Sequence, residues 1–469
     1  MSSDNRPANG PNHASPQIKM PQDDSRSTTN PSSRFTLVAL ISGLLLLGMF
    51  FGASLWIIAA VAAFLLLALN AWLTKTWATA VHATRSEDDA EVKLGSLVPV
   101  RIRVHNRSKV PVLWVLIEDL LPKRATFFTP PALELSGDRI RVALLWGKQS
   151  EILDYQIRCN RRGYYQIGPT VLETGDLMGF YRRFRVGSPP SYLTVLPEVV
   201  SLTRYEIGSR RPIGEIRMRE NVMNDPTRLR GIRQWQPGDP MRSVHWSATA
   251  RTGTLHSKIY EPSSVIGATL VLDLHQHTNP TAQEPVRSDL AITAAASIAN
   301  ALHEANEPFG LATNGRDAAD RIRQEGWSGD HRLRGEAANA AGMKDENERL
   351  RPIMLPPDRG TTHYAELIRS LARLERTDGL TLPELLVECE SQLSSETTLL
   401  VILQRCDEAS IAALIALSRR GRSVTVMINT HDINDYSEIA GPLIASKITT
   451  LHLASFDQIQ DVCRQTLVR

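Results

Sequence analysis

The hydrophobic pattern divides the chain into a polar start, two long apolar runs and a mixed remainder. Residues 35–52 read FTLVALISGLLLLGMFFG and residues 55–73 read LWIIAAVAAFLLLALNAWL, and neither run contains a charge. Each run is long enough to cross about 30 Å of hydrocarbon as a helix. Because only residues 53 and 54 separate them, the runs predict a transmembrane helical hairpin over 35–73. The alternative is a buried hairpin in a soluble core.

The flanks of the hairpin predict its orientation in a lipid bilayer. Arg26 and Arg34 precede it, while Lys75 and Arg85 follow it. Flanks that carry Lys and Arg stay in the cytoplasm, so we expect two spanning helices with both termini cytoplasmic. Residues 1–34 are rich in Ser, Pro, Asn and Asp, and they predict a disordered cytoplasmic tail.

Residues 87–202 change to a period of two. VPVRIRVHN, WVLIEDLLP, RIRVALLW and EILDYQIRC alternate apolar and polar residues in short runs separated by turn-rich stretches. Such alternation is typical of antiparallel strands with one buried face. The pattern predicts a β-rich domain, an antiparallel sandwich or barrel, and we expect the sandwich-like form.

Residues 264–469 alternate strands with helices. ATLVLDLH, FGLAT, TTLLVILQ and SVTVMINT are largely apolar runs, and helical stretches such as SDLAITAAASIANALHEA lie between them. Strands buried on both faces have this character, so the order predicts a doubly wound α/β sheet. Residues from about 315 to 360 are polar and rich in Gly and Ala, which predicts a mobile insertion.

The charge distribution and the cysteine content indicate which segment is basic and which redox compartment to expect. The net charge is only +3, but between Ser201 and Lys258 eleven Lys and Arg stand against five Asp and Glu. The basic excess therefore lies in the segment that joins the two predicted domains, residues 203–263. The four cysteines have no Cys-x-x-Cys spacing, which predicts free thiols in a reducing compartment.

The joining segment contains QPGDPMRSVHWSATARTG, residues 236–253. Its Pro-Gly pair suits the centre of a type II turn, which would present the following aspartate to nearby arginines. Arginines can also stack on tryptophan faces. The candidate residues are Arg233, Trp235, Pro237, Gly238, Asp239, Arg242, His245, Trp246 and Arg251. We interpret them as a lock between the two domains and as a surface for a protein partner.

Other interpretations of this segment are weaker. Interleaved basic and aromatic residues could bind single-stranded nucleic acid, but acidic residues are interspersed and a membrane tether argues against it. We therefore expect no nucleic-acid partner. Ser243, His245 and Asp239 supply the groups of a hydrolytic triad, but such close spacing on an extended segment rarely gives the required geometry.

The remaining searches for catalytic motifs find no match. The sequence has no Gly-x-x-x-x-Gly-Lys-Ser/Thr loop, no Gly-x-Ser-x-Gly elbow and no His-Glu-x-x-His helix. We therefore expect a protein without enzymatic activity.

A longer stretch around this motif carries a family resemblance. LRGIRQWQPGDPMRSVHWSATARTGTLHSKIYEP, with RRGYYQIGPTVLETGDLMGFYRRFRV and SYLTVLPEV upstream, resembles the DUF58 family of bacterial proteins. The resemblance implies a transmembrane hairpin, a β-rich domain, the signature and a von Willebrand factor A-like domain. It also implies a place in the bacterial inner membrane and action with a MoxR-type AAA+ ATPase in assembling or remodelling an unidentified client protein.

The same resemblance raises the question of a metal site. A von Willebrand A domain commonly carries Asp-x-Ser-x-Ser after its first strand, where oxygen ligands hold Mg²⁺. The position here is similar to Asp273-x-His275-x-His277, with histidine in place of each serine. A degenerate site without metal, a Mg²⁺ site and a zinc or iron site all stay open. We expect no cofactor, and a metal-dependent enzyme using these residues is the alternative function.

Overall fold

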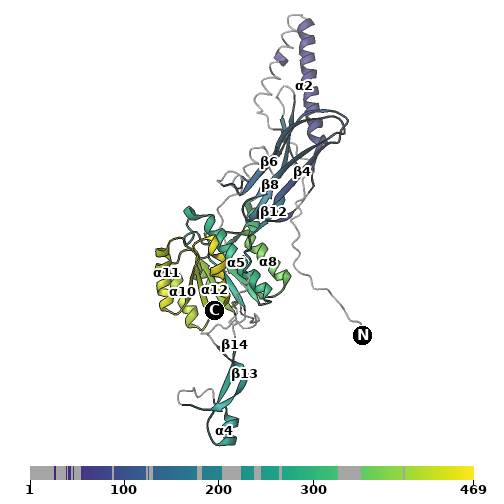
Figure 1. Cartoon of the computed structure of the whole chain (residues 1–469). Coiled ribbons are helices and arrows are strands. Elements are labelled where there is room, and N and C mark those ends of the chain that lie inside the picture. Colours follow the sequence, from purple (N-terminus) through teal and green to yellow (C-terminus); the bar gives the residue numbers. More distant parts are fainter. Residues whose placement is uncertain are drawn as a thin grey trace, which may run out of the picture. The chain divides into compact units, whose positions relative to one another are not determined.

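The computed structural model divides the chain into two compact units (Figure 1). The first comprises residues 1–193 and 322–344, and the second residues 194–321 and 345–469. The structure describes residues 26–27, 39, 41–43, 46, 54–86, 89–122, 125, 130–176, 182–202, 223–236, 244–263, 267–325, 350–393 and 397–468. Most of the predicted tail and residues 326–349 of the predicted insertion lie outside these described residues.

A long apolar helix begins the well-described part of the first unit. Helix α2 spans Ser54–Ala80. Its segment Ile57–Ala80 is the one helix, among the described residues, that is long and apolar enough to cross a membrane. Residues 39, 41–43 and 46 are also helical and fall within the first predicted span. The helix ends seven residues later than the predicted boundary at residue 73, because its last turns gain partners in the β-rich domain.

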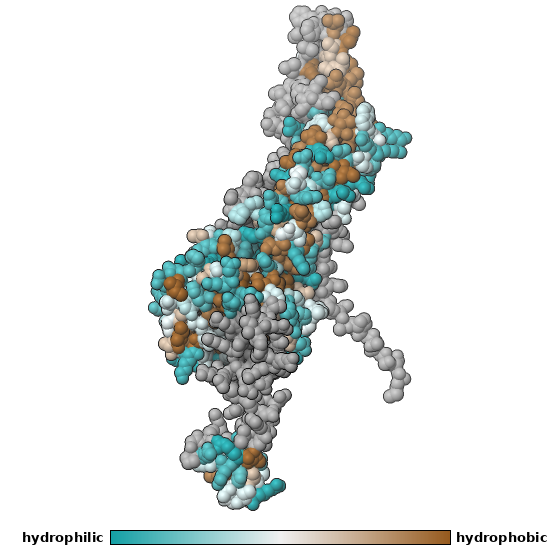
Figure 2. All heavy atoms as spheres, in the orientation of Figure 1, coloured by the Kyte–Doolittle hydropathy of each residue, from teal (hydrophilic) through white to brown (hydrophobic). Residues whose placement is uncertain are grey.

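The two ends of α2 have different surroundings. Asn70, Thr74 and Trp77 are buried, with 8%, 0% and 2% of their surfaces exposed. The large apolar side chains that α2 exposes are Leu55, Ile58, Val61, Phe64, Leu65, Leu66, Leu69 and Trp72. Figure 2 shows this apolar surface along the helix. The helix is therefore apolar and exposed over most of its length, and packed against protein near its end.

The end of α2 is built into the β-rich domain. Asn70 donates from Nδ2 to Asp176 Oδ2 at 2.6 Å. The helix ends at Ala80 and strand β2 begins at Val81, so no linker separates them. The β-rich domain consequently begins at residue 81, earlier than the predicted residue 87.

The β-rich domain contains three sheets, and the strands of its two larger sheets pair antiparallel, as the alternating pattern predicted. Its strands are β2 (Val81–Arg85), β3 (Ala90–Lys93), β4 (Leu97–Asn106), β5 (Val112–Asp119), β6 (Leu133–Gly137), β7 (Ile140–Leu145), β8 (Ser150–Cys159), β9 (Gly163–Ile167), β10 (Thr170–Gly175), β11 (Arg182–Ser188) and β12 (Ser191–Leu196). With β1 (Arg26–Ser27), their sheets have the orders β1-β11-β10-β5-β7, β2-β4-β8-β6 and β3-β12-β9. Alternate residues of β4 and β8 are buried, including Ile102, Leu153 and Ile157 at 0% exposure.

A short strand corrects the prediction of a wholly disordered tail. Strand β1, Arg26–Ser27, pairs antiparallel with β11, Arg26 opposite Phe184 and Ser27 opposite Arg183. An edge strand such as β11 presents unpaired backbone N–H and C=O groups that can bind any extended segment. Composition alone does not reveal such pairing, because backbone groups make it.

The second unit contains a six-stranded sheet in the order β18-β16-β15-β20-β21-β22. Its strands are β15 (Ala268–Leu272), β16 (Phe309–Thr313), β18 (Ile353–Asp358), β20 (Thr398–Leu403), β21 (Val424–Ile428) and β22 (Thr449–His452). All neighbours pair in parallel except β18, which is antiparallel to β16.

Helices cover both faces of this sheet. They are α5 (Val286–Glu304), α8 (Thr361–Arg373), α9 (Leu382–Glu388), α10 (Glu408–Arg419), α11 (Ile433–Ala445) and α12 (Ile459–Val468). Leu270 and Leu272 of β15 pack into the core with α5, α8 and α12, whereas Val271 packs into the core with α9, α10 and α11. Successive residues of one strand thus point into two cores, the arrangement of a doubly wound α/β sheet.

The ends of the predicted mobile insertion, about 315–360, are regular structure. Helix α6 (Ala318–Glu325) and strand β18 lie inside that range. Arg321 donates from Nε and Nη2 to the two carboxylate oxygens of Glu375, at 2.6 and 2.7 Å. Because this order comes from ion pairing and tertiary contact, apolar periodicity did not predict it.

Candidate functional site

The signature segment folds as a two-stranded ribbon. Strand β13 (Met223–Gln234) pairs antiparallel with β14 (His256–Ser263). Helix α4, Trp246–Thr252, lies between the two strands in the chain, and Figure 1 shows it at the end of the ribbon. The ribbon and its helix therefore carry those of the selected residues that the structure describes.

His245 has a structural role at the start of α4. Its Nδ1 accepts a hydrogen bond from the backbone N–H of Ala248 at 3.0 Å, so the imidazole caps the helix. Gly253, with φ of 73°, ends the helix and donates its N–H to Thr249 O at 2.9 Å. A left-handed residue at this position is the usual glycine end of a helix.

The tip of the ribbon exposes large side chains. Trp246 is 65% exposed, and α4 buries none of its residues. Ile232 and Leu255 are 42% and 38% exposed, and Arg251 is exposed in the last turn of α4. Tryptophan and arginine next to apolar side chains are the residues that dominate protein-recognition surfaces.

The structure places five of the nine signature candidates. Arg233 and Trp235 are half-buried on the ribbon: Arg233 Nη1 donates to Gln234 O at 3.2 Å, and Trp235 N donates to Leu255 O at 2.8 Å. His245, Trp246 and Arg251 belong to α4 and its cap. Pro237, Gly238, Asp239 and Arg242 lie outside the described residues. The pairing of Asp239 with arginines, and the domain lock built on it, stay predictions.

Polar residues also converge at the carboxyl end of the α/β sheet, the edge where such sheets bind ligands. Asp273 follows β15, Asn314 follows β16, and Asn429 follows β21, and each is at most 2% exposed. Asp273 Oδ1 accepts hydrogen bonds from Asn314 Nδ2 at 2.7 Å and from His275 N at 3.1 Å. The carboxylate thus holds neighbouring loops together.

The three candidate metal ligands are close in the chain but do not form a metal centre. His275 is buried and His277 exposed, and His275 Nδ1 accepts from the backbone N–H of His277 at 3.3 Å. Asp273 Oδ1 already has two donors, while Oδ2 is buried without a hydrogen-bond partner. No three His, Cys, Asp or Glu side chains in the described part of the chain are grouped to hold a metal ion.

The electrostatics of this edge also favour a structural role. Burial raises the pKa of Asp273 above its ordinary value, and the polar groups of Thr278 and Asn314 nearby oppose the shift. Burial, with Asp407 and Asp273 nearby, raises the pKa of Cys406 to about 12, so the thiol is not ionised at neutral pH. Asp407 caps α10, its Oδ1 accepting from Ser410 N at 2.9 Å.

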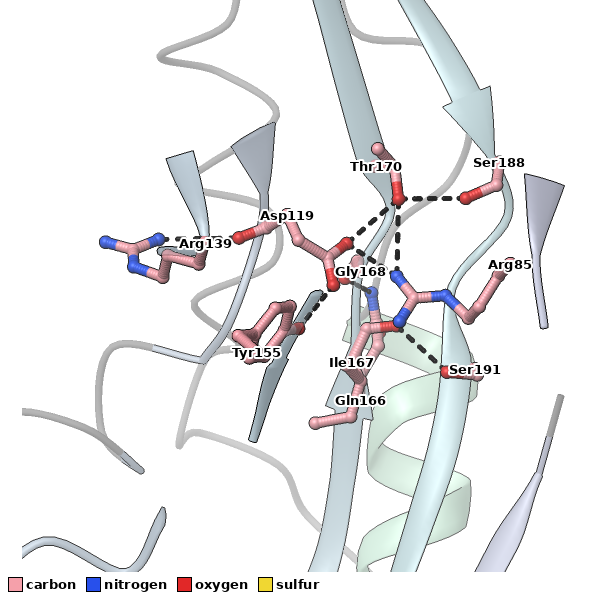
Figure 3. A network of polar contacts seen from close by, with 10 residues as sticks. All are labelled: Arg85, Asp119, Arg139, Tyr155, Gln166, Ile167, Gly168, Thr170, Ser188 and Ser191. Carbon is pink, nitrogen blue, oxygen red and sulfur yellow. Dashed lines mark hydrogen bonds and ion pairs between the residues drawn. The ribbon is translucent and has the colours of Figure 1, made fainter. Parts of the chain in front are cut away.

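A second buried polar cluster lies in the β-rich domain, and the sequence did not predict it (Figure 3). Arg85 of β2 pairs with Asp119 at the end of β5, Nη2 to Oδ1 at 2.5 Å, with side-chain exposures of 5% and 0%. Thr170 donates to Asp119 Oδ1 at 3.0 Å and Tyr155 to Oδ2 at 2.5 Å. Because β2 and β8 belong to one sheet and β5 and β10 to another, the cluster joins the two sheets.

The geometry of this cluster is specific. Gly168 has φ of +91°, and a Cβ there would lie 2.8 Å from Arg85 Nη2, so only glycine allows the guanidinium its place. Burial lowers the pKa of Arg85, but Asp119 and Tyr155 outweigh it, and the pKa is raised overall. Burial and the Asp119 charge raise the pKa of Tyr155 well above its ordinary value. At neutral pH the arginine is therefore charged and the phenol neutral.

The region that a known protein family matches includes part of the signature ribbon. A family model described as "Protein of unknown function DUF58" matches residues 231–334. The uncharacterized protein YeaD of Bacillus subtilis (strain 168) is 23% identical over 247 residues, which cover 52% of this chain and 58% of that protein. The chain thus matches less than two thirds of that relative's length. The chain is thus similar to the DUF58 family over residues 231–334.

Two solved domains are each similar to this chain over about a quarter of its length. The CARDB domain of a Pyrococcus furiosus protein, in complex with di-metal ions, has a TM-score of 0.16 and 12% identity, covering 24% of this chain and 89% of its own. A PapD-like domain of human CEP192 has a TM-score of 0.17 and 14% identity, covering 25% and 84%. Likenesses this weak carry no argument about function.

Substitutions of Arg85 and Asp119 should be coupled in their effect on stability. We expect Asp119→Leu or Arg85→Met each to lower the free energy of unfolding by about 3–5 kcal/mol, because a buried charge loses its partner. The double variant should be less destabilised than the sum of the two by about 2 kcal/mol or more. Urea unfolding of the detergent-purified full chain measures this, and additive effects would show that the two residues are not coupled.

The raised pKa of Asp273 predicts a pH-dependent stability. Burial favours the protonated carboxyl, so its contribution is fully present below the ordinary pKa of 3.8 and is lost as pH rises through the raised folded-state value. Asp273→Asn removes the charge and keeps the shape. We expect this variant to be at least as stable as wild type at neutral pH and to lose that advantage on acidification. A constant difference across pH in thermal unfolding would be incompatible with a strained carboxylate.

Proposed function

We propose that the chain is a membrane-anchored cytoplasmic scaffold or adaptor, acting with a MoxR-type AAA+ ATPase in the assembly or remodelling of other proteins. One observation carries the anchor: the apolar N-terminal region is attached to the same β-rich domain at both of its ends. Strand β1 pairs with β11 before the apolar runs, and α2 continues into β2 after them.

This attachment supports a two-span topology. If α2 crosses a bilayer, residues 28–53 have to cross it as well, since the chain leaves the β-rich domain at Ser27 and returns to it at Val81. Residues 35–52 supply an uncharged run of sufficient length. Basic residues on both flanks favour a cytoplasmic β-rich domain. The bacterial inner membrane follows from the family resemblance.

The second unit supplies the scaffold's working surface in this proposal. Its doubly wound sheet, with Asp273 after the first strand, supports a von Willebrand A-like assignment. The signature ribbon, with Trp246 exposed at its tip, is the surface we assign to the ATPase partner. The alternative, a metal-dependent enzyme, gains no support from the hydrogen-bonded arrangement of Asp273 and His275.

Substitution of Trp246 tests the partner surface. We expect an AAA+ ATPase to co-purify with the wild-type chain from gently solubilised membranes, and Trp246→Ala to reduce its yield roughly tenfold or more. Val142→Ala is the control, because Val142 is a large apolar side chain that is 64% exposed but lies in the β-rich domain. Mass spectrometry identifies the captured proteins, and protease resistance checks the fold of both variants. Absence of any AAA+ ATPase in every nucleotide state would refute the proposed partnership.

A further inference from the structure

Two turns of the β-rich domain lie beside the end of α2. One joins β4 to β5, residues 107–111, and the other joins β7 to β8, residues 146–149. Strand β2 starts directly after α2, and its first residue, Val81, pairs with Asn106 at the end of β4. Strand β8 starts on the other side of β4 at the same end. Both turns therefore stand at the end of the sheet from which α2 departs.

Hydrogen bonds fix these turns to each other and to the helix. The backbone N–H of Arg107 donates to Ala80 O, at the end of α2, at 2.9 Å. The side chain of the fully buried Asn106 donates from Nδ2 to Val110 O in one turn at 2.9 Å and to Trp146 O in the other at 3.2 Å. The position of both turns relative to α2 is thus set by the fold.

The two turns present cations and a tryptophan to solvent. Their exposed side chains of these kinds, which we call the basic rim, are Arg107, Lys109, Trp146 and Lys148. Residues 107–111 and 146–149 contain no Asp or Glu. The pKa of His82, just after α2, is lowered by burial and by Arg185, Arg107 and His105, against a hydrogen bond to Ala80. Positive charge therefore gathers around the end of the helix.

The rim lies close to the point where α2 leaves apolar surroundings. Trp72 is the last large apolar side chain that the described helix exposes, and Lys75 is exposed about one turn later. Tryptophan and lysine in this order are typical of the border between hydrocarbon and headgroups. Ala80 lies five positions after Lys75, which is about 7.5 Å of helix. The headgroup layer on one side of a bilayer is of similar depth, about 5–8 Å.

We propose that the basic rim binds the headgroups of anionic phospholipids and so holds the β-rich domain against the membrane surface. This inference rests on the proposed anchor. Arginine and lysine side chains near an anionic leaflet are attracted to it, and the attraction falls off within a Debye length. The Trp146 ring suits the same layer, since its apolar face and its N–H can both find partners there. The rim adds a second membrane contact beside α2.

A fluorescent label on the rim tests this contact in the full-length chain. In a Cys406→Ser background, because Cys406 is the half-buried native thiol, the label is placed at Gln149→Cys or at Lys93→Cys. Lys93 is the control position: it precedes the start of β4, whose ten residues span about 33 Å. The protein is reconstituted into phosphatidylcholine vesicles with or without phosphatidylglycerol, each containing a headgroup-attached quencher.

We expect strong quenching at position 149 when phosphatidylglycerol is present, and weak quenching at position 93. Reversing two rim charges, Lys109→Glu with Lys148→Glu, should reduce quenching at position 149 about threefold or more, as should high salt. Lys93→Glu, the matched charge reversal at the other end of β4, should leave it unchanged. Unaltered thermal unfolding of the variants confirms that the fold is retained.

Failure of the rim and failure of the anchor give different results. If alkaline carbonate releases the wild-type protein from the vesicles, the anchor is wrong and the rim proposal falls with it. If the protein stays integrated but position 149 is unquenched, or is quenched equally without phosphatidylglycerol, the rim does not bind anionic headgroups and the anchor stands.

Discussion

Continuity between helix α2 and the β-rich domain is the constraint on which the rest of the first unit depends. A helix with an exposed apolar surface needs a firm connection to the protein it carries. Here the connection has three parts: a buried Trp77, a polar contact between Asn70 and Asp176, and a strand that begins at the residue after the helix. The helix therefore cannot turn or tilt without moving the domain.

The buried cluster around Arg85 completes this connection. Asp176 follows β10 and contacts α2, while Thr170 at the start of the same strand contacts Asp119 and Arg85. Arg85 ends β2, the strand that continues from α2. Strand β10 is thus joined to β2 at its start and to helix α2 at its end. We interpret the buried ion pair as the element that fixes how the two sheets meet, at the cost of desolvating two charges.

The sequence predicted those features that depend on apolar patterning. The uncharged run at 55–73 predicted a long apolar helix, and the alternation in β4 and β8 predicted strands with one buried face. Both kinds of element are present. The sequence could not predict features made by backbone or buried polar groups. The pairing of β1 with β11 is made by backbone groups and has no side-chain signal. In the sequence, Asp119 cannot be distinguished from a solvent-exposed strand residue, because only the fold brings Arg85 next to it.

The candidate sites show the same division. Trp246 and Arg251 could be selected from the sequence because large and charged residues cluster there, and the structure presents them on one helix. The Asp273-x-His275-x-His277 spacing suggested metal ligands, but spacing does not show which side-chain atoms already accept hydrogen bonds. Asn314, distant in the chain, occupies Asp273 Oδ1 instead.

The central claim is that the apolar region leaves the β-rich domain and returns to it on the same side of a bilayer. Topology reporters test this most directly: green fluorescent protein and alkaline phosphatase are fused in turn to the N- and C-termini of the full-length chain in a bacterial host. Two crossings predict fluorescence from both fluorescent-protein fusions and no phosphatase activity from either phosphatase fusion, because the phosphatase needs an oxidising compartment. Active phosphatase at the N-terminus with fluorescence at the C-terminus would mean a single crossing and would contradict the account.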